Sequence, residues 1–161
     1  MPKNLNDLLY ETLKDIYFAE KQILTALPRL AEAAQATELR EAFQTHATQT
    51  ATHVARLEQI FDIIDKPAEQ KPCKAILGII EEGKEVMSEF EGTAALDAGL
   101  LAGAQAVEHY EISRYGTMLA WAERLGLDEV AALLAETLDE EEATDELLSE
   151  IAETTVNAEA A

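Results

Sequence analysis

The sequence predicts one all-α domain, a bundle of four long helices with an extra short helix. Three observations support this prediction: apolar residues recur at steps of three and four along four long segments, Gly and Pro are few, and no comparable segment alternates apolar and polar residues. With 161 residues, the chain is long enough to bury a core. We expect a single domain over residues 1–161, with a frayed tail from about residue 156.

The first two helices are expected to be antiparallel neighbours. The first covers about residues 4–35, where Asn4 and Asp7 offer N-terminal capping chemistry. Pro28 removes one backbone hydrogen bond inside this helix, but the apolar stripe continues past it, which favours a kink rather than an end. The second helix covers about residues 37–65, and the very short link before it forces the chain to reverse.

A long connection separates the second and third long helices. It begins with the Pro- and Lys-rich stretch KPAEQKPCK and continues into a short amphipathic helix that ends near Gly92. A helix of about 15 residues spans roughly 22 Å, so this connection can return along the bundle. The remaining long helices are expected over about residues 93–125 and 128–155. Two antiparallel hairpins joined by one long crossover give the ferritin-like connectivity.

Charge and cysteine content exclude several classes of function. Twelve basic and 32 acidic residues give a net charge of -20, which disfavours nucleic-acid and anionic membrane partners. Cys73 is the only cysteine, so an intramolecular disulfide and a cysteine-based zinc site are excluded. Neither a signal peptide nor an apolar span of about 18 residues is visible, and we expect a cytoplasmic protein.

Polar residues replace apolar ones in the middle of each helical stripe. In the first helix this residue is Glu20, and in the third Glu108 and Glu111 lie one turn apart. In the second helix the middle third of the stripe is His46, Thr50 and His53. All of these positions lie within about one turn of their helix midpoints, so the bundle is expected to bring them to one level.

The fourth helix allows two inner faces. One consists of Leu134, Leu138, Glu141, Asp145 and Leu148, and the other of Leu133, Thr137, Glu140, Thr144 and Leu147. We favour the first face, which places Glu141 at the level of the other acids.

Burying several carboxylates costs several kcal/mol each unless a charge compensates them, and a cation is the natural compensator. Carboxylates and imidazoles without thiols suit iron or manganese, and Glu with Glu-x-x-His motifs is the pattern of di-metal carboxylate bundles. We expect one or two such ions. The candidate ligands are Glu20, His53, Glu108, Glu111, Glu141 and Asp145.

Structural roles remain open for each of these residues. The acids of the first and third helices can instead form ion pairs with Lys21 or Arg114, and Glu141 lies in the run DEEE, which is typical of a solvated face. His53 is equally consistent with a ligand and with a core histidine that contacts a carboxylate. His46 is expected beside the ligands rather than among them, and His109 is expected to be exposed.

Four stretches, DIYFAEKQILTALPRLAEAA, HVARLEQIF, AQAVEHYEISRYGTM and ETLDEEEATDELL, resemble the YciE/YciF family of bacterial ferritin-like stress proteins, also called DUF892. The resemblance covers nearly the whole chain. It implies a ferritin-like fold, a dimer and expression under stress, with no settled biochemical activity.

Glu20, Glu108, Glu111 and Glu141 are further similar to the carboxylate ligands of rubrerythrin-type di-iron bundles. The chain departs from that pattern in having Thr50-x-x-His53 in place of Glu-x-x-His, and Thr144 where a histidine is expected.

These observations predict a ferritin-like protein that binds iron or manganese and acts in the bacterial stress response. The alternative is a non-catalytic structural or interaction protein with a vestigial or absent metal site. A homodimer is also expected, because the crossover helix carries more apolar surface than the exterior of a polar bundle needs. Its apolar residues are Ile76, Leu77, Ile79, Ile80, Val86, Met87 and Phe90.

Overall fold

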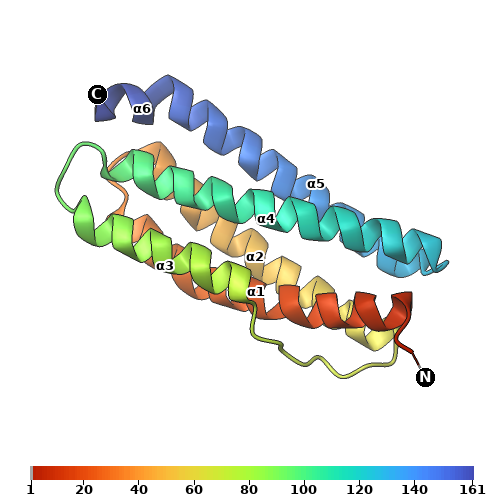
Figure 1. Cartoon of the computed structure of the whole chain (residues 1–161). Coiled ribbons are helices and arrows are strands. Elements are labelled where there is room, and N and C mark those ends of the chain that lie inside the picture. The colour runs from red at the N-terminus through yellow and green to blue at the C-terminus, as the bar shows by residue number, and fades with distance from the viewer. Residues whose placement is uncertain (1) are drawn as a thin grey trace.

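The computed structural model describes residues 2–161, and within them four long helices form a bundle with a shorter helix on its side (Figure 1). The predicted all-α fold class is confirmed. The elements are α1 (Leu5–Ala33), α2 (Thr37–Ile63), α3 (Lys74–Glu89), α4 (Leu96–Arg124), α5 (Asp128–Ile151), the π-helical segment η1 (Ala152–Val156) and α6 (Asn157–Ala160).

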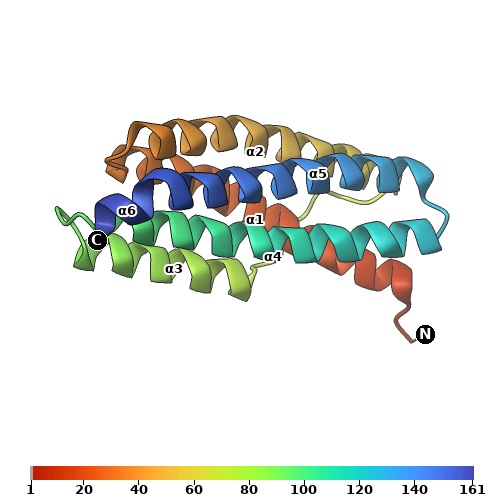
Figure 2. The ribbon, with the colours of Figure 1, turned by 90° about the horizontal axis from the view of Figure 1, so that it is seen from above.

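The connectivity is that of two hairpins and one crossover. Helices α1 and α2 run antiparallel, as do α4 and α5, whereas α2 and α4 run in the same direction (Figure 1). The segment after α2 returns along the side of the bundle, and α3 completes this return before α4 begins. Figure 2 shows α3 beside α4 on the outside of the bundle, away from α2. This arrangement matches the predicted ferritin-like connectivity.

The start of α1 is fixed by a capping box. The Asn4 side chain accepts a hydrogen bond from the backbone N–H of Asp7 at 3.2 Å, and the Asp7 carboxylate accepts one from the backbone N–H of Asn4 at 2.8 Å. Helix α1 then continues through Pro28 to Ala33, as its apolar stripe indicates.

Asp97 joins the two hairpins. This buried residue in the first turn of α4 accepts hydrogen bonds from the backbone N–H groups of Gln35 at 2.8 Å and Ala36 at 2.6 Å, in the link between α1 and α2. A carboxylate with two backbone donors is a strong, charge-assisted contact. It holds the link at a fixed position beside α4.

The crossover helix α3 is anchored at its N-terminus. The Cys73 sulfur accepts a hydrogen bond from the backbone N–H of Ile76 at 3.3 Å and lies 2.9 Å from the Tyr110 hydroxyl of α4. The same hydroxyl donates to Asp15 of α1 at 2.9 Å. Ile76 is the one fully buried side chain of α3, and Leu77 and Phe90 are exposed.

The C-terminal chain remains helical beyond the expected end. The π-helical segment follows α5 directly, and α6 reaches Ala160, past the end near residue 155 that the sequence indicated, while fraying of the tail stays a prediction. The reason is burial, because Ile151, Ala152 and Val156 all pack into the core and hold these turns against the bundle. Among the described residues, no helix combines the length and hydropathy that a membrane crossing requires.

Candidate metal centre

Six buried polar residues meet at the middle of the bundle in two overlapping groups. Within each group, one nitrogen or oxygen ligand atom from every residue lies within 4.8 Å of the others. The two groups share one glutamate, and no member is more than 5% exposed. The first group is His46, Glu108, Glu111 and Glu141, and the second is Glu20, His53 and Glu141.

Each long helix contributes to the centre through its own periodicity. Helix α2 supplies both histidines, which lie seven residues, or about two turns, apart on one face. Their ring centroids are 6.5 Å apart. Helix α4 supplies Glu108 and Glu111 from successive turns, and α1 and α5 each supply one glutamate.

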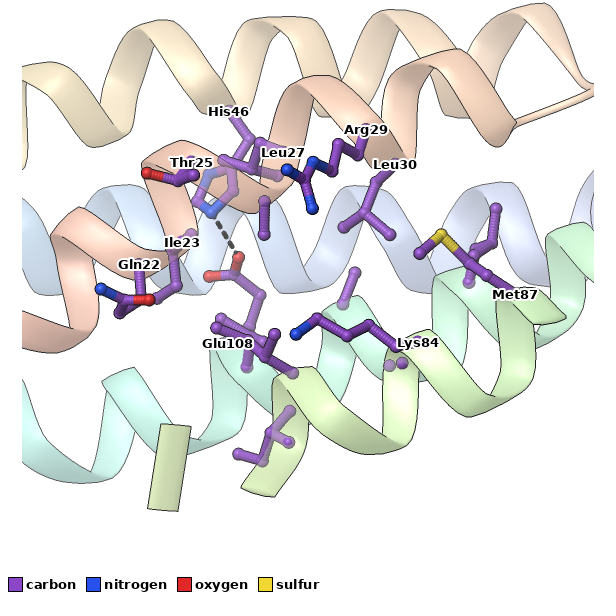
Figure 3. Close-up of a pocket in the computed structure, with 18 of the residues that line it drawn as sticks. Gln22, Ile23, Thr25, Leu27, Arg29, Leu30, His46, Lys84, Met87 and Glu108 are labelled. Carbon is purple, nitrogen blue, oxygen red and sulfur yellow. Dashed lines mark ion pairs between the residues drawn. The ribbon is translucent and has the colours of Figure 1, made fainter. Parts of the chain in front are cut away.

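The imidazole rings face the carboxylates at short range. His53 Nδ1 lies 2.7 Å from Glu141 Oε1 and 3.5 Å from Glu20 Oε2. His46 Nε2 lies 2.7 Å from Glu108 Oε1, and Figure 3 shows this pair between α2 and α4. The contacts therefore join all four helices through ionisable groups.

Most of these carboxylate oxygens have no hydrogen-bond donor. Both oxygens of Glu111 are buried without a hydrogen-bond partner, and so are Glu20 Oε1, Glu108 Oε2 and Glu141 Oε2, which no imidazole approaches. Buried polar atoms in folded proteins are normally hydrogen-bonded, so a group of unpartnered oxygens at one place requires an explanation. A bound cation would supply one, and the geometry of the two groups could hold such an ion.

The electrostatics show how much charge this core has to compensate. Burial raises the pKa of Glu108 to about 12, with a further rise from the nearby carboxylate of Glu141. Burial also raises the pKa of Glu111 well above its usual range, followed by the charges of Glu141 and Glu20. Without a cation, protons on these two acids take over the compensation.

His53 is the main positive group of the metal-free core. Burial alone would lower its pKa, but the contacts with Glu141 and Glu20 outweigh burial and raise the pKa to about 10. An imidazolium here neutralises part of the acidic charge, as a metal ion bound at Nδ1 would.

A second ring of contacts orients His53. Its Nε2 lies 2.7 Å from Glu140 Oε2, and Arg56 donates to both oxygens of Glu140, at 2.9 and 2.8 Å. Arg56 also donates to Thr137 at 3.2 Å. A carboxylate that fixes the far nitrogen of a histidine is the common support of a metal-bound imidazole. Sequence reasoning placed Glu140 only on the alternative inner face and missed this role.

Tyr115 of α4 is a further buried residue of the site. Its buried hydroxyl has no hydrogen-bond partner. Burial, and then the charges of Glu20, Glu111 and Glu141, raise its pKa well above the usual range. Tyr115 therefore places a neutral phenol beside these glutamates.

Two expectations about individual residues need correction. Asp145 belongs to neither group, and its half-buried carboxylate lies 3.1 Å from the exposed His109. Asp145 lies one turn beyond Glu141 and contacts His109 of α4 instead of the buried acids. His46, expected beside the ligands, is a member of the first group. The imidazole expected from α5 at Thr144 thus has a counterpart in His46 of α2.

Two threonines stand where the di-iron pattern has a glutamate and a histidine, and both donate hydrogen bonds to neighbouring groups. Thr50 is buried and donates to the backbone carbonyl of His46 at 2.8 Å. Thr144 donates to Gln49 at 3.2 Å and to the carbonyl of Glu140 at 3.0 Å. Neither hydroxyl is part of the two groups.

Comparison with known proteins places the chain among bacterial relatives. The family model "Domain of unknown function (DUF892)" matches residues 4–161. Protein YciF of Escherichia coli K12 is 41% identical over 156 residues, which cover 96% of this chain and 94% of the relative.

Solved structures agree with this relationship. The crystal structure of the E. coli stress protein YciF matches with a TM-score of 0.92 at 41% identity, covering 97% of this chain and 99% of the other. YcfI, described as a putative structural protein from Rhodopseudomonas palustris, matches with a TM-score of 0.89 at 41% identity, over 91% of this chain and 94% of the other. A Xanthomonas campestris protein at 22% identity, with a TM-score of 0.76 over 96% and 94% of the two chains, shares the fold.

Proposed function

The chain belongs to the DUF892 family, and from this premise and the geometry of its core we propose that it is a stress-response protein whose bundle holds a pair of iron or manganese ions. One observation carries the proposal: the buried carboxylate oxygens without hydrogen-bond partners that lie between two histidines. The role in stress is inferred from the E. coli relative, which is described as a stress protein.

Charge supports two ions rather than one. The two groups contain four glutamates and two histidines. With the glutamates ionised and the histidines neutral, as ligands must be, the core carries a charge of about -4, which two divalent ions neutralise. One divalent ion would leave two buried negative charges without compensation, at a cost of several kcal/mol each.

The overlap of the groups indicates how the ligands divide. His46, Glu108 and Glu111 would hold one ion, Glu20 and His53 would hold the other, and Glu141 would bridge them. A metal pair of this kind supplies Lewis-acid and redox chemistry. The protein's own residues orient the ligands, through Arg56 and Glu140, and exclude water through the surrounding apolar side chains.

A structural protein on the same bundle is the second candidate, and one observation favours it. The pKa of His53 is raised to about 10, so an imidazolium together with protonated acids can neutralise the core without metal. The Rhodopseudomonas relative is itself described as a putative structural protein.

Equilibrium dialysis of chelator-treated protein against Mn(II) distinguishes the two. The metal proposal predicts about two bound ions per chain, and strongly reduced binding in Glu141→Gln, because that substitution removes the shared ligand. Glu142→Gln is the matched control, since Glu142 is the exposed neighbour on the same helix. Binding that is absent in the wild type, or equal in Glu141→Gln and Glu142→Gln, would favour the structural protein.

A further inference from the structure

A mostly apolar cavity connects the protein surface with the candidate metal centre. It lies between α1, α3 and α4 and has a volume of about 170 Å³. His46 and Glu108 lie at its buried inner end, and the exposed residues Arg29 and Lys84 line its outer part (Figure 3). The remaining wall is formed mainly by aliphatic side chains, including Ile23, Leu27, Leu30, Ile80, Met87 and Leu100.

Two glycines in helix interiors leave this space open. A Cβ added at Gly83 of α3 or Gly103 of α4 would meet no atom within 4 Å, and both glycines line the cavity. Glycine inside a helix is less favourable than alanine by about 0.5 to 1 kcal/mol, and at neither position does a neighbouring atom exclude a Cβ. At Gly99, by contrast, a Cβ would lie 2.5 Å from Val86 Cγ1, so that position allows α3 to approach α4.

The two ends of the cavity differ in charge. Arg29 forms no ion pair with any other described residue, and Lys84 has only the exposed Glu81, at 3.5 Å. These are cations at the mouth of an apolar cavity in a chain of net charge -20. At the inner end, Glu108 Oε2 and His46 Nδ1 are buried without hydrogen-bond partners. An anionic group is therefore favoured at the mouth and disfavoured inside.

We propose that the cavity binds an aliphatic carboxylate, with its anionic head at Arg29 and Lys84 and its hydrocarbon tail directed toward Glu108 and His46. The volume is close to that of an engineered apolar cavity of about 150 Å³ that accepts benzene, so a chain of about six to eight carbons is of suitable size. The proposal rests on the proposed function for its chemical meaning, because the tail would end beside the metal pair. Binding itself requires only the cavity and its two cations.

Octanoate titrated into chelator-treated protein by calorimetry tests the binding. We expect saturable binding with one site per chain, and binding to Gly103→Leu weakened about tenfold or more, because the new side chain occupies the cavity. Gly116→Leu is the matched control: Gly116 lies on the same helix, also meets no atom within 4 Å, and is not part of the cavity. Equal affinity in the two variants, or no saturable binding by the wild type, would overturn the proposal.

Charge variants test the position of the head without perturbing the core. Arg29→Gln is expected to weaken octanoate binding by about three- to tenfold, a range appropriate for one partly exposed ion pair. Arg124→Gln removes an equivalent exposed charge at the far end of α4 and should leave the affinity unchanged. If 1-octanol binds as tightly as octanoate, and Arg29→Gln does not matter, the assigned head position is wrong.

Mn(II)-loaded protein tests the direction of the tail and separates this proposal from the metal proposal. Paramagnetic broadening by Mn(II) in the core should be stronger for the terminal methyl protons of bound octanoate than for the methylene beside its carboxylate. The reverse order would overturn the orientation. Metal content is measured in parallel, so protein that binds octanoate but no Mn(II) contradicts only the metal pair, and protein that binds Mn(II) but no octanoate contradicts only the cavity ligand.

Discussion

Glu108 is the residue at which the energetic cost of burying a carboxylate can best be measured apart from its neutralisation by a metal ion. It is 1% exposed, its pKa is raised to about 12 by burial and then by Glu141, and it belongs both to the candidate metal centre and to the lining of the cavity. In metal-free protein it folds as the neutral acid, whereas in the unfolded chain it ionises near pH 4.5. Its contribution to stability is therefore fully present below about pH 4.5 and falls as pH rises.

The metal-free protein should accordingly lose stability from about pH 5 to pH 9. The raised pKa of His53, about 10, acts in the same direction, since its proton is also bound more tightly in the folded state. Glu108→Gln, which mimics the protonated acid, should raise the free energy of unfolding at pH 8 by more than about 1 kcal/mol, and change it little at pH 4. Chemical denaturation with chelator present measures both. A variant that is no more stable than wild type at pH 8 would contradict the buried neutral acid.

The support of His53 gives a second prediction at this scale. Glu140→Gln should lower Mn(II) affinity about 10- to 100-fold, because the carboxylate that Arg56 holds no longer orients the imidazole. Glu136→Gln is the control, since Glu136 lies 3.2 Å from Arg56 but does not contact His53. Titration calorimetry with Mn(II) gives the comparison. Equal losses in both variants would show that Glu140 acts through overall charge and not by orienting His53.

At single positions, the sequence predicted which residues lie in the core better than it predicted which residues contact each other. The stripes placed Glu20, Glu108 and Glu141 in the core because a period of 3.6 residues fixes the face of a helix. The same periodicity placed His46 on this face, seven residues before His53, although we expected it beside the ligands rather than among them. Contacts between helices, such as His53 with Glu140, depend on side-chain geometry that helix periodicity does not contain.

At the scale of elements, the attachment of one hairpin to the other depends on Asp97. Asp97→Asn keeps the shape of the side chain but replaces one acceptor oxygen by a donor, so one of the two backbone N–H groups at Gln35 and Ala36 loses its partner. We expect a destabilisation of about 1 to 3 kcal/mol. Asp62→Asn, at an exposed residue of α2, should be nearly neutral. Thermal or urea unfolding provides the measurement, and equal stability of the two variants would contradict the role of Asp97.

The crossover was predictable from the length of the connection between α2 and α4 alone, because a tight turn needs far fewer residues. What length could not predict is how α3 packs. Gly99 allows close contact with Val86, whereas Gly83 and Gly103 leave space beside that contact. The sequence alone does not distinguish these three glycines. The structure shows that one of them lets two helices approach closely and that the other two leave open space in the cavity.

At the scale of the whole molecule, the homodimer stays a prediction. Packing of α3 against α4 and α1 buries or half-buries Ile76, Ile80 and Met87. The exposed large apolar residues are then Leu77 of α3 and Phe90, which follows the last residue of α3. Sedimentation velocity at tens of micromolar, a range in which interfaces of ordinary affinity are occupied, should show twice the chain mass. Replacing Leu77 and Phe90 by serine should shift the protein toward monomer. A wild-type monomer at that concentration would contradict the prediction.

The account depends on a metal pair in the core, and anomalous diffraction from crystals of Mn(II)-loaded protein tests it most directly. We expect two anomalous peaks inside the bundle, about 3.5 to 4 Å apart, as in other two-metal sites. One should lie beside Glu20 and His53, the other beside His46, Glu108 and Glu111, with Glu141 between them. Peaks found only at exposed acidic residues, with none in the core of loaded protein, would contradict the metal centre.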